Sequence, residues 1–401
     1  MPKITSIKLT SIKLIISAIG IIGFIFAPQP NFTEQNYPTA LAQIPSSKPS
    51  GLSQEVLQEL TQCVREIVKP TEASLEAIQV ASMQCTMRVI MLSPDGKFRP
   101  DANQRMEALL EISGASLPGI LSQGKATVKL EKLTNSQVFT LPVIVAGETK
   151  NFLLDTGASN TIIESKIAEN LGLASTPIPN DLLSYFVVGD DCSNVNANIH
   201  TLPTIKVDAA TVKGLQGMGL SKTAIPGNLS GVLGLDFLKG FDVIINPQTS
   251  QLELLPPSSS VNNAIPLIGR MGVMLAEVKI NGKGPFLFLL DTGADLMVLS
   301  QNLANELGVD LADAEKIDVL GFCGTEIAHK TKLDTVSLQQ YEVSQLDGVI
   351  IDNQILDLIG IDGIVGQNFL SRYQQHWRFD KSNNLGFPET GSLLLTPLEN
   401  D

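Results

Sequence analysis

The chain has 401 residues, 43% of them hydrophobic, and its 28 basic and 41 acidic residues give a formal net charge of −13. This length and hydrophobic content allow two or three buried cores. The negative charge and the lack of a basic run argue against nucleic acid as a partner, because phosphates would be repelled.

The first 42 residues have the pattern of a signal peptide. Three lysines precede an apolar stretch from Leu14 to Ala27, and Ala40-Leu41-Ala42 offers a small-x-small cleavage site. The apolar stretch is short for a transmembrane helix. We therefore expect an exported protein, periplasmic or extracellular. Cleavage nearer Ala27, or retention of residues 14–27 as a membrane anchor, is the alternative.

Residues 43–125 are expected to form a linker and a small α-helical region. Three segments have helical patterns separated by Pro and Gly, at residues 54–68, 73–91 and 102–112. Cys63 and Cys85 fall on the first two of these helices. Export makes a disulfide between them reasonable, and two buried free thiols are the alternative.

Three roles are open for this helical region: a removable inhibitory segment, a partner-binding module or a packing extension. Its acidic and basic residues are balanced in number. It therefore lacks the basic bias that would neutralise an acidic cleft, and the inhibitory role ranks below the other two.

A β-rich unit then occurs twice, over residues 138–256 and 264–390. The motif FLLDTGA stands at 152–158 and again at 288–294, each time at the end of an apolar run typical of a buried strand. A return strand and a short helix ending in Gly follow each copy. The chain is therefore predicted to be mainly β, with two lobes in tandem.

Asp155 and Asp291 are the candidate catalytic residues. Hydrolysis of a peptide bond without a metal or a covalent nucleophile requires an activated water and a polarised amide. Two carboxylates that share one proton supply both, because the ionised one takes a proton from water while the neutral one donates to the carbonyl oxygen. Since one lobe supplies one carboxylate, the two lobes must face each other across a two-fold axis.

Six neighbouring residues are expected to support this pair: Thr156, Gly157, Ala158, Thr292, Gly293 and Ala294. The threonine hydroxyls would cross-brace the two loops by hydrogen bonds to the backbone. The glycines would keep the backbone clear of the water. The alanines supply no hydroxyl donor to the charged pair, so we expect a mildly rather than strongly acidic pH optimum.

At these residues the sequence resembles the retropepsin-like aspartic peptidases. Asp-Thr-Gly-Ala, a following apolar strand, and an apolar pair before Gly (Val232-Leu233-Gly234 and Ile364-Val365-Gly366) match that family's pattern twice. The resemblance implies one β-barrel-like lobe per unit, a substrate cleft between the lobes, and Asp155 and Asp291 as the catalytic dyad. The family's usual lobe is a separate subunit of a homodimer. Both lobes are here in one chain, so a monomer is expected.

Other hydrolytic chemistries fit the sequence poorly. Three histidines without His-Glu-x-x-His, and four cysteines without Cys-x-x-Cys, argue against a zinc site, and neither a metal nor another cofactor is expected. A serine or cysteine nucleophile would need an imidazole nearby. His376 is interpreted as a structural histidine on the last strand of the second lobe.

The predicted function is that of an aspartic endopeptidase acting on a polypeptide substrate. The alternative is a catalytically silent peptide-binding or scaffold protein with the same fold. The presence of both aspartates, both threonines and both glycines favours the enzyme, because a binding module needs none of them. The sequence leaves the physiological substrate and the cleaved bond open.

Hairpins that cover the cleft are expected at about residues 184–199 and 317–332, with Cys192 and Cys323 in them. In a pseudo-symmetric pair of lobes these hairpins approach each other near the two-fold axis. A disulfide between the two cysteines would hold the cleft closed until it is reduced. The alternative is two unpaired, packed thiols.

Overall fold

The computed structural model describes residues 12–13, 51–68, 75–96, 98–113, 119–178, 180–183, 187, 189, 191–311 and 314–398. The expected signal peptide lies outside the described residues except for β1 (Ile12–Lys13), which pairs in parallel with β20 (Lys316–Gly321). Within the described part of the chain, no helix is both long enough and apolar enough to cross a membrane.

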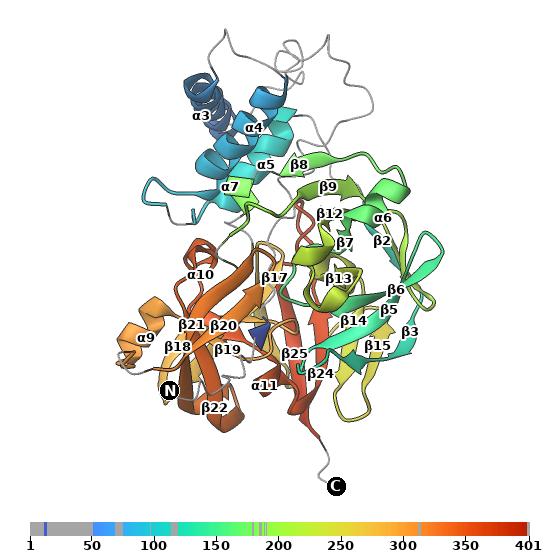
Figure 1. The fold of residues 1–401 in the computed structure, drawn as a ribbon, viewed down its shortest axis with the longest axis vertical. Coiled ribbons are helices and arrows are strands. Elements are labelled where there is room, and N and C mark those ends of the chain that lie inside the picture. Colours follow the sequence, from blue (N-terminus) through green and yellow to red (C-terminus); the bar gives the residue numbers. More distant parts are fainter. Residues whose placement is uncertain are drawn as a thin grey trace, which may run out of the picture.

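A small helical region sits against one end of the β-rich body (Figure 1). It consists of α3 (Gly51–Ile67), α4 (Leu75–Thr86), the π-helical turn η3 (Met87–Met91) and α5 (Ala102–Ser113). A disulfide joins Cys63 on α3 to Cys85 on α4, with a Cα–Cα distance of 5.8 Å. The expected helices are therefore present, and a cross-link holds the first two together.

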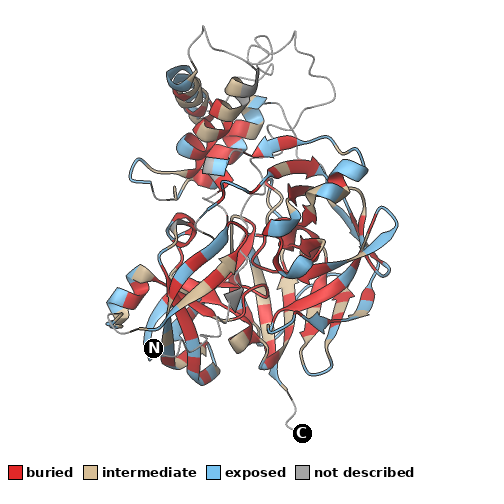
Figure 2. Ribbon diagram, in the orientation of Figure 1, coloured by how far each residue is buried: buried red, intermediate tan, exposed pale blue. Residues whose placement is uncertain are grey.

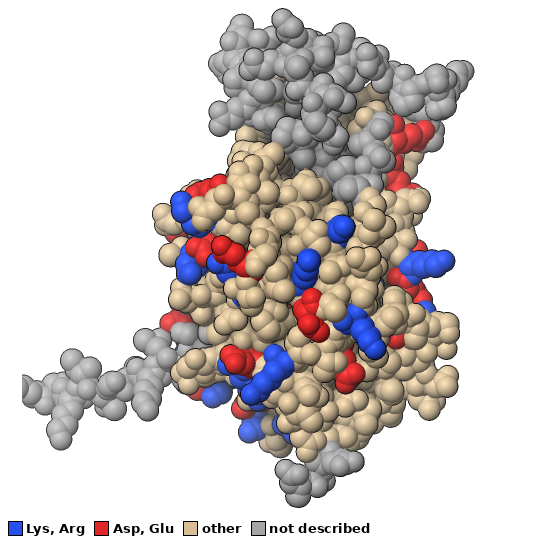
Figure 3. All heavy atoms as spheres, turned by 90° about the vertical axis from the view of Figure 1, so that its right-hand side faces the viewer, with Lys and Arg blue, Asp and Glu red and all other residues tan. Residues whose placement is uncertain are grey.

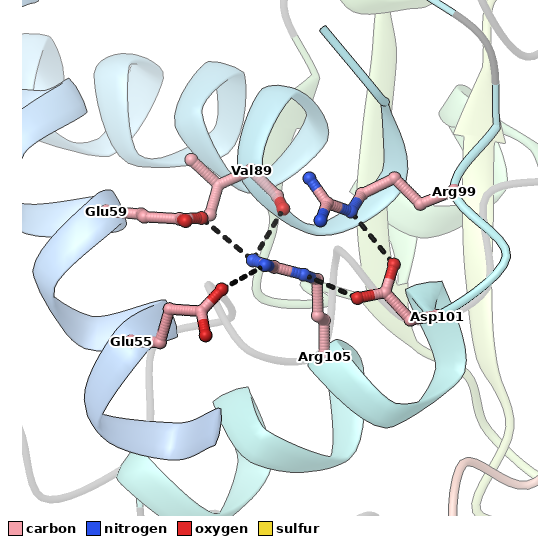
Figure 4. Close-up of polar contacts among 6 residues, drawn as sticks. All are labelled: Glu55, Glu59, Val89, Arg99, Asp101 and Arg105. Atoms are coloured by element: carbon pink, nitrogen blue, oxygen red, sulfur yellow. Dashed lines mark hydrogen bonds and ion pairs between the residues drawn. The ribbon is translucent and has the colours of Figure 1, made fainter. Parts of the chain in front are cut away.

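A buried arginine connects these helices to one another (Figure 4). The Arg105 guanidinium on α5 is 3% exposed and donates to Glu55 at 2.6 Å, to Glu59 at 2.8 Å and to Asp101 at 3.0 Å. It also donates to the carbonyl oxygen of Val89 in η3. A buried guanidinium is tolerated only when its donors are satisfied, so this cluster fixes α3 and η3 against α5.

The remaining elements form two lobes. The first contains β2 (Leu121–Gln123), β3 (Ala126–Lys129), β4 (Glu131–Lys132), β5 (Phe139–Val145), β6 (Glu148–Leu154), β7 (Ile162–Glu164), α6 (Ser165–Asn170), β8 (Thr176–Ile178), α7 (Asn180–Leu183), β9 (Ala197–Thr201), β10 (Ile205–Val207), β11 (Ala210–Lys213), β12 (Gln216–Leu220), the 3-10 turns η4 (Lys222–Ala224) and η5 (Pro226–Asn228), β13 (Gly231–Leu233), α8 (Leu235–Leu238), β14 (Asp242–Asn246) and β15 (Gln251–Leu255).

The second lobe repeats this plan. It contains β16 (Ile265–Arg270), β17 (Val273–Ile280), β18 (Lys283–Leu290), β19 (Met297–Ser300), α9 (Gln301–Leu307), β20, β21 (Gly324–Leu338), β22 (Tyr341–Ile351), α10 (Gln354–Ile359), β23 (Gly363–Val365), α11 (Gln367–Leu370), β24 (Tyr373–Phe379) and β25 (Thr390–Pro397). The fold is thus mainly β, as predicted, with two tandem lobes and a small helical region.

The same three strands carry the aspartate motif in each lobe. In the first lobe β6 pairs in parallel with β13, which pairs antiparallel with β7. In the second lobe β18, β23 and β19 repeat this arrangement. Residues 152–154 and 288–290 are fully buried. Strands buried on both faces read as continuous apolar runs, which explains these two segments.

One sheet runs through both lobes. The six strands at one end of this sheet have the order β16–β25–β24–β14–β15–β3, in which β14, β15 and β3 belong to the first lobe and the other strands to the second. At the junction β14 and β24 pair antiparallel, with Val243 opposite Trp377. The other strands of the first lobe form a second sheet, in which β2 pairs with β11. With β2 in that sheet and β25 in the shared one, the strands of the two lobes extend from Leu121 to Pro397, beyond the expected lobe bounds of 138 and 390.

Two hairpins approach the helical region, β8 with β9 from the first lobe and β20 with β21 from the second. Their connecting segments are joined by a disulfide between Cys192 and Cys323, with a Cα–Cα distance of 4.5 Å. Buried residues of the helices, of both hairpins and of the strands beneath them form one continuous hydrophobic core. Figure 2 shows this buried layer running from the helices into the lobes.

Candidate active site

Asp155 and Asp291 lie at corresponding ends of β6 and β18, where the two lobes meet. The Asp155 N–H donates to the carbonyl oxygen of Leu233 at 3.2 Å, and the Asp291 N–H donates to that of Val365 at 3.0 Å. Each aspartate is therefore held at the end of its strand by the neighbouring parallel strand. Both are completely buried, at 0% exposure.

The threonines that follow the aspartates lock the two loops together. The Thr156 N–H donates to Thr292 Oγ1 at 3.0 Å, and the Thr292 N–H donates to Thr156 Oγ1 at 3.1 Å. In turn Thr156 Oγ1 donates to the carbonyl oxygen of Leu290, and Thr292 Oγ1 to that of Leu154. Each threonine hydroxyl thus accepts one hydrogen bond from the backbone of the opposite lobe and donates another to it. These four bonds leave the two loops little freedom to separate.

The motif glycines bring the backbone of each lobe against the carboxyl group of the other. A Cβ placed on Gly157 would lie 2.4 Å from Asp291 Cγ, and one placed on Gly293 would lie 2.5 Å from Asp155 Cγ. Real Cβ atoms do not approach other atoms this closely, so a larger residue would displace the carboxylates. The glycines are required here for space.

One oxygen of each carboxyl group, Oδ1, is fixed by backbone N–H groups. Asp155 Oδ1 accepts from Gly157 at 2.7 Å and from Ala158 at 2.9 Å. Asp291 Oδ1 accepts from Gly293 at 2.7 Å. The Oδ2 atoms of both aspartates are buried without a hydrogen-bond partner among the described residues. These two buried acceptor atoms receive no N–H bond, as a proton shared between the two carboxyl groups requires.

Burial and proximity make this pair prefer protons. Burial raises the pKa of Asp155 to about 7, although hydrogen bonds from Asp291 and from the backbone of Gly157 and Ala158 oppose the rise. Burial, together with the charge of Asp155, raises the pKa of Asp291 well above its usual range. The two carboxyl groups therefore titrate as a unit, in which the first proton loss leaves one proton shared between them.

The carboxyl pair is closed to solvent in this structure. The hairpins joined by Cys192–Cys323 lie in the same buried core as Ala158 and Ala294, the residues next to the two motif glycines. The Asp191 N–H donates to the carbonyl oxygen of Cys323 at 3.0 Å, and a Cβ on Gly189 would lie 2.4 Å from the Cys323 carbonyl carbon. The hairpins are thus in close backbone contact as well as cross-linked.

Other candidate residues from the sequence lie away from the pair. Cys63 and Cys85 form the disulfide of the helical region. His376 is on β24, the second-last strand, where its Nε2 lies 3.3 Å from Asp242 Oδ2 across the junction of the lobes. Among the described residues, no group of three or more His, Cys, Asp or Glu side chains is arranged to hold a metal ion.

The sequence interpretation missed two residues that act on the motif loops. Asp295 Oδ1 accepts from Ser136 Oγ at 2.7 Å and from the Gln137 N–H at 2.6 Å, which ties the second motif loop to the first lobe. Gln367 Nε2 donates to the carbonyl oxygen of Thr292 at 3.0 Å. The sequence does carry a signal for Gln367. The two units correspond over residues 231–238 (GVLGLDFL) and 363–370 (GIVGQNFL), and Leu235 stands where the second unit has Gln367, but this difference alone does not reveal the partner of the amide.

Comparisons with known proteins match each lobe separately. The model of the family described as gag-polyprotein putative aspartyl protease matches residues 141–240 and 276–372. The crystal structure of a retropepsin-like aspartic protease from Rickettsia conorii is similar at 21% identity, over 33% of this chain and 95% of that chain, with a TM-score of 0.23. Among curated proteins, none matches this chain.

Proposed function

Because this chain belongs to the retropepsin-like aspartic peptidase family, with two lobes in tandem, we propose that it is an aspartic endopeptidase in which Asp155 and Asp291 form the catalytic dyad. The observation that carries the proposal is the pair of unpartnered, buried Oδ2 atoms, one from each lobe. Reciprocal threonine hydrogen bonds hold the loops that present them.

The asymmetry of the pair suggests a role for each carboxyl group. Asp155 has two backbone donors on Oδ1 and so carries the negative charge better. It takes a proton from the water, whose oxygen adds to the carbonyl carbon of the substrate. Asp291 gives its proton to the carbonyl oxygen. When the resulting diol collapses, the C–N bond breaks, Asp155 passes its proton to the leaving nitrogen, and one hydroxyl proton returns to Asp291.

A catalytically silent binding protein is the second candidate, and the burial of the dyad favours it. Both aspartates are at 0% exposure, and linked hairpins from both lobes belong to the core that also contains Ala158 and Ala294, so a peptide can reach the dyad only if this region opens. Catalysis therefore requires an open state of the hairpins, whereas a scaffold role does not.

We further propose that the protein is exported and monomeric and acts on polypeptides. Export would be consistent with the two disulfides, and both halves of the dyad come from one chain. Figure 3 shows acidic and basic side chains interspersed over one face, which indicates no preference for a strongly charged partner there.

Mass-spectrometric profiling of a denatured protein mixture tests the proposed activity. We expect the purified mature protein, with and without a dithiol reductant, to produce new peptide termini that are absent with Asp155→Asn or Asp291→Asn. Cleavage that persists unchanged in both folded Asn variants would assign the activity to another site. No cleavage under either condition would favour the binding protein.

A further inference from the structure

One buried position beside the dyad carries an apolar residue in the first lobe and an amide residue in the second. Leu235 begins α8 in the first lobe, and Gln367 begins α11 at the equivalent position of the second. The backbone plays the same part in both lobes. The Leu235 N–H donates to the carbonyl oxygen of Ala158 at 2.7 Å, and the Gln367 N–H donates to that of Ala294 at 2.8 Å.

Only the second lobe adds a side-chain bond at this position. Gln367 is 0% exposed, and its Nε2 donates to the carbonyl oxygen of Thr292 at 3.0 Å. The other end of the amide accepts from Ser371 Oγ at 2.7 Å, which fixes its orientation. A leucine side chain has no polar atom and offers the first lobe no such bond.

The carbonyl group that Gln367 binds belongs to the peptide between Thr292 and Gly293. The N–H of that same peptide donates to Asp291 Oδ1 at 2.7 Å. A peptide whose carbonyl oxygen accepts a hydrogen bond is polarised, so its N–H becomes a stronger donor. Asp155 Oδ1, by contrast, has two backbone donors of its own.

We propose that Gln367 is a positioning residue for Asp291. Its amide holds and polarises the Thr292–Gly293 peptide, and this supports the carboxyl group of Asp291, whose Oδ1 accepts from the N–H of that peptide. As a statement about catalysis the proposal rests on the proposed peptidase function. As a statement about the carboxyl pair it stands on the geometry alone.

The expected consequence concerns the two proton losses of the dyad. The charged group that faces Asp291 is Asp155, and the two titrate as a unit. After the first loss the charge lies on Asp155, and Asp291 keeps its proton. Removal of the Gln367 donor weakens the bond to ionised Asp291, which is needed only after the second loss. The higher apparent pKa should therefore rise, while the lower one stays in place.

The test compares Gln367→Met with Leu235→Met, its match in the first lobe. Methionine keeps a similar volume but removes the amide of Gln367. For Gln367→Met we expect the basic limb of the kcat profile to move up by about half a pH unit and kcat to fall by about tenfold, with KM little changed. Leu235→Met should leave both limbs in place. Ser371→Ala keeps the donor but releases its anchor, so it should give a smaller shift in the same direction.

A turnover-independent measurement separates this inference from the proposed function. Carboxyl ¹³C NMR titration, assigned with Asp155→Asn and Asp291→Asn, reports the upper pKa of the pair even if no peptide is cleaved. A rise in Gln367→Met then supports the inference although the peptidase proposal fails. An unchanged upper pKa in folded Gln367→Met, or an equal rise in Leu235→Met, overturns it. If Gln367→Met does not fold, the Ser371→Ala titration decides in the same way.

Discussion

Gly157 of the first lobe lies directly against the carboxyl group of Asp291 in the second, and Gly293 lies in the same way against Asp155. Neither motif glycine has a positive φ angle. The backbone conformation would therefore accept any residue, and the carboxyl group of the opposite lobe is what excludes a side chain. The glycine of each Asp-Thr-Gly motif therefore forms a contact between the two lobes.

Substitution of Gly157 by Ala should abolish activity by displacing the Asp291 carboxyl group. The added Cβ would lie 2.6 Å from both of its oxygens. We expect a loss of at least about 100-fold in kcat, because misplacement of a catalytic group by about 1 Å costs this much. Steady-state kinetics measure the loss. Gly348→Ala is the control, since its Cβ would meet neighbours at 3.4 Å or more. Equal activity of the two variants would contradict the close approach.

Substitution of Asp155 or Asp291 by Asn should each remove activity. Either change leaves no carboxyl pair to share a proton, so we expect kcat to fall by at least about 10³-fold. The fold should survive, because an Asn oxygen still accepts the backbone N–H bonds at Oδ1. Circular dichroism and thermal unfolding check the fold alongside the kinetics. A folded Asn variant that cleaves at the wild-type rate would show that the dyad lies elsewhere.

Stability should decrease as the pH rises through neutrality. Burial raises the pKa of Asp155 to about 7, and burial together with the charge of Asp155 raises the pKa of Asp291 well above its usual range. Groups with raised pKa values favour the folded state when protonated. Their contribution is therefore fully present below the unfolded pKa and is lost as the pH passes the folded values, at up to about 1.4 kcal/mol per pH unit for each proton.

Denaturant unfolding between about pH 4 and pH 8 measures this dependence. The Asp291→Asn variant is the control, because it removes one buried titrating group and the charge that faces Asp155. Its unfolding free energy should vary less with pH than that of the wild type. The same steep dependence in wild type and variant would place its origin outside the dyad.

The activity optimum should be mildly acidic. Ala158 and Ala294 provide no hydroxyl donor to the ionised pair, and burial already opposes the first proton loss. Ala158→Ser should supply a donor and shift the acid limb of the pH–rate profile to lower pH. A wild-type optimum near pH 2 would contradict the prediction, as would a Ser variant whose profile sharpens without moving.

Reduction of the Cys192–Cys323 disulfide should increase activity. The bond joins hairpins from the two lobes in the core that covers the dyad. A dithiol that reduces it, and is itself oxidised, should allow the hairpins to separate and admit a peptide. We expect at least about a tenfold increase in kcat/KM, reproduced without reductant by Cys192→Ser with Cys323→Ser.

The second disulfide provides the matched control. Cys63→Ser with Cys85→Ser removes the bond within the helical region and should not reproduce the activation. Non-reducing peptide mapping establishes the pairing in the oxidised protein. Two alkylatable thiols at Cys192 and Cys323, or a linked peptide whose reduction leaves activity unchanged, would end the gating hypothesis.

Local patterns were sufficient to predict the strands that end at Asp155 and Asp291, because strands buried on both faces are uniformly apolar and the motif occurs twice. The helices of the N-terminal region could also be predicted, because Pro and Gly residues mark the breaks between them. The burial of Arg105 could not be predicted, because a charged residue on a helix usually faces water. Only the packed helices bring three carboxylates to its guanidinium group.

Relations between distant segments could not be predicted from the sequence. The strand Ala126–Lys129 is short and half polar, and its place in a sheet depends on a partner more than a hundred residues away. The link between Cys192 and Cys323 depends on a distance that only the folded lobes define. The bond from Gln367 to Thr292 likewise requires the exact approach of α11 to the motif loop, which side-chain chemistry does not fix by itself.

The sheet that runs through both lobes also sets an order of events during synthesis. Asp155 emerges from the ribosome with most of its own lobe, and β14 can pair with β15 at once. It gains its second neighbour only when β24 has been made, and β25 completes that part of the sheet last. N-terminal domains generally fold first during translation. A nascent chain that ends before Tyr373 therefore lacks the pairing that brings the lobes together. A chain that ends between Asp291 and Tyr373 would carry both aspartates and still lack the β14–β24 pairing between the lobes.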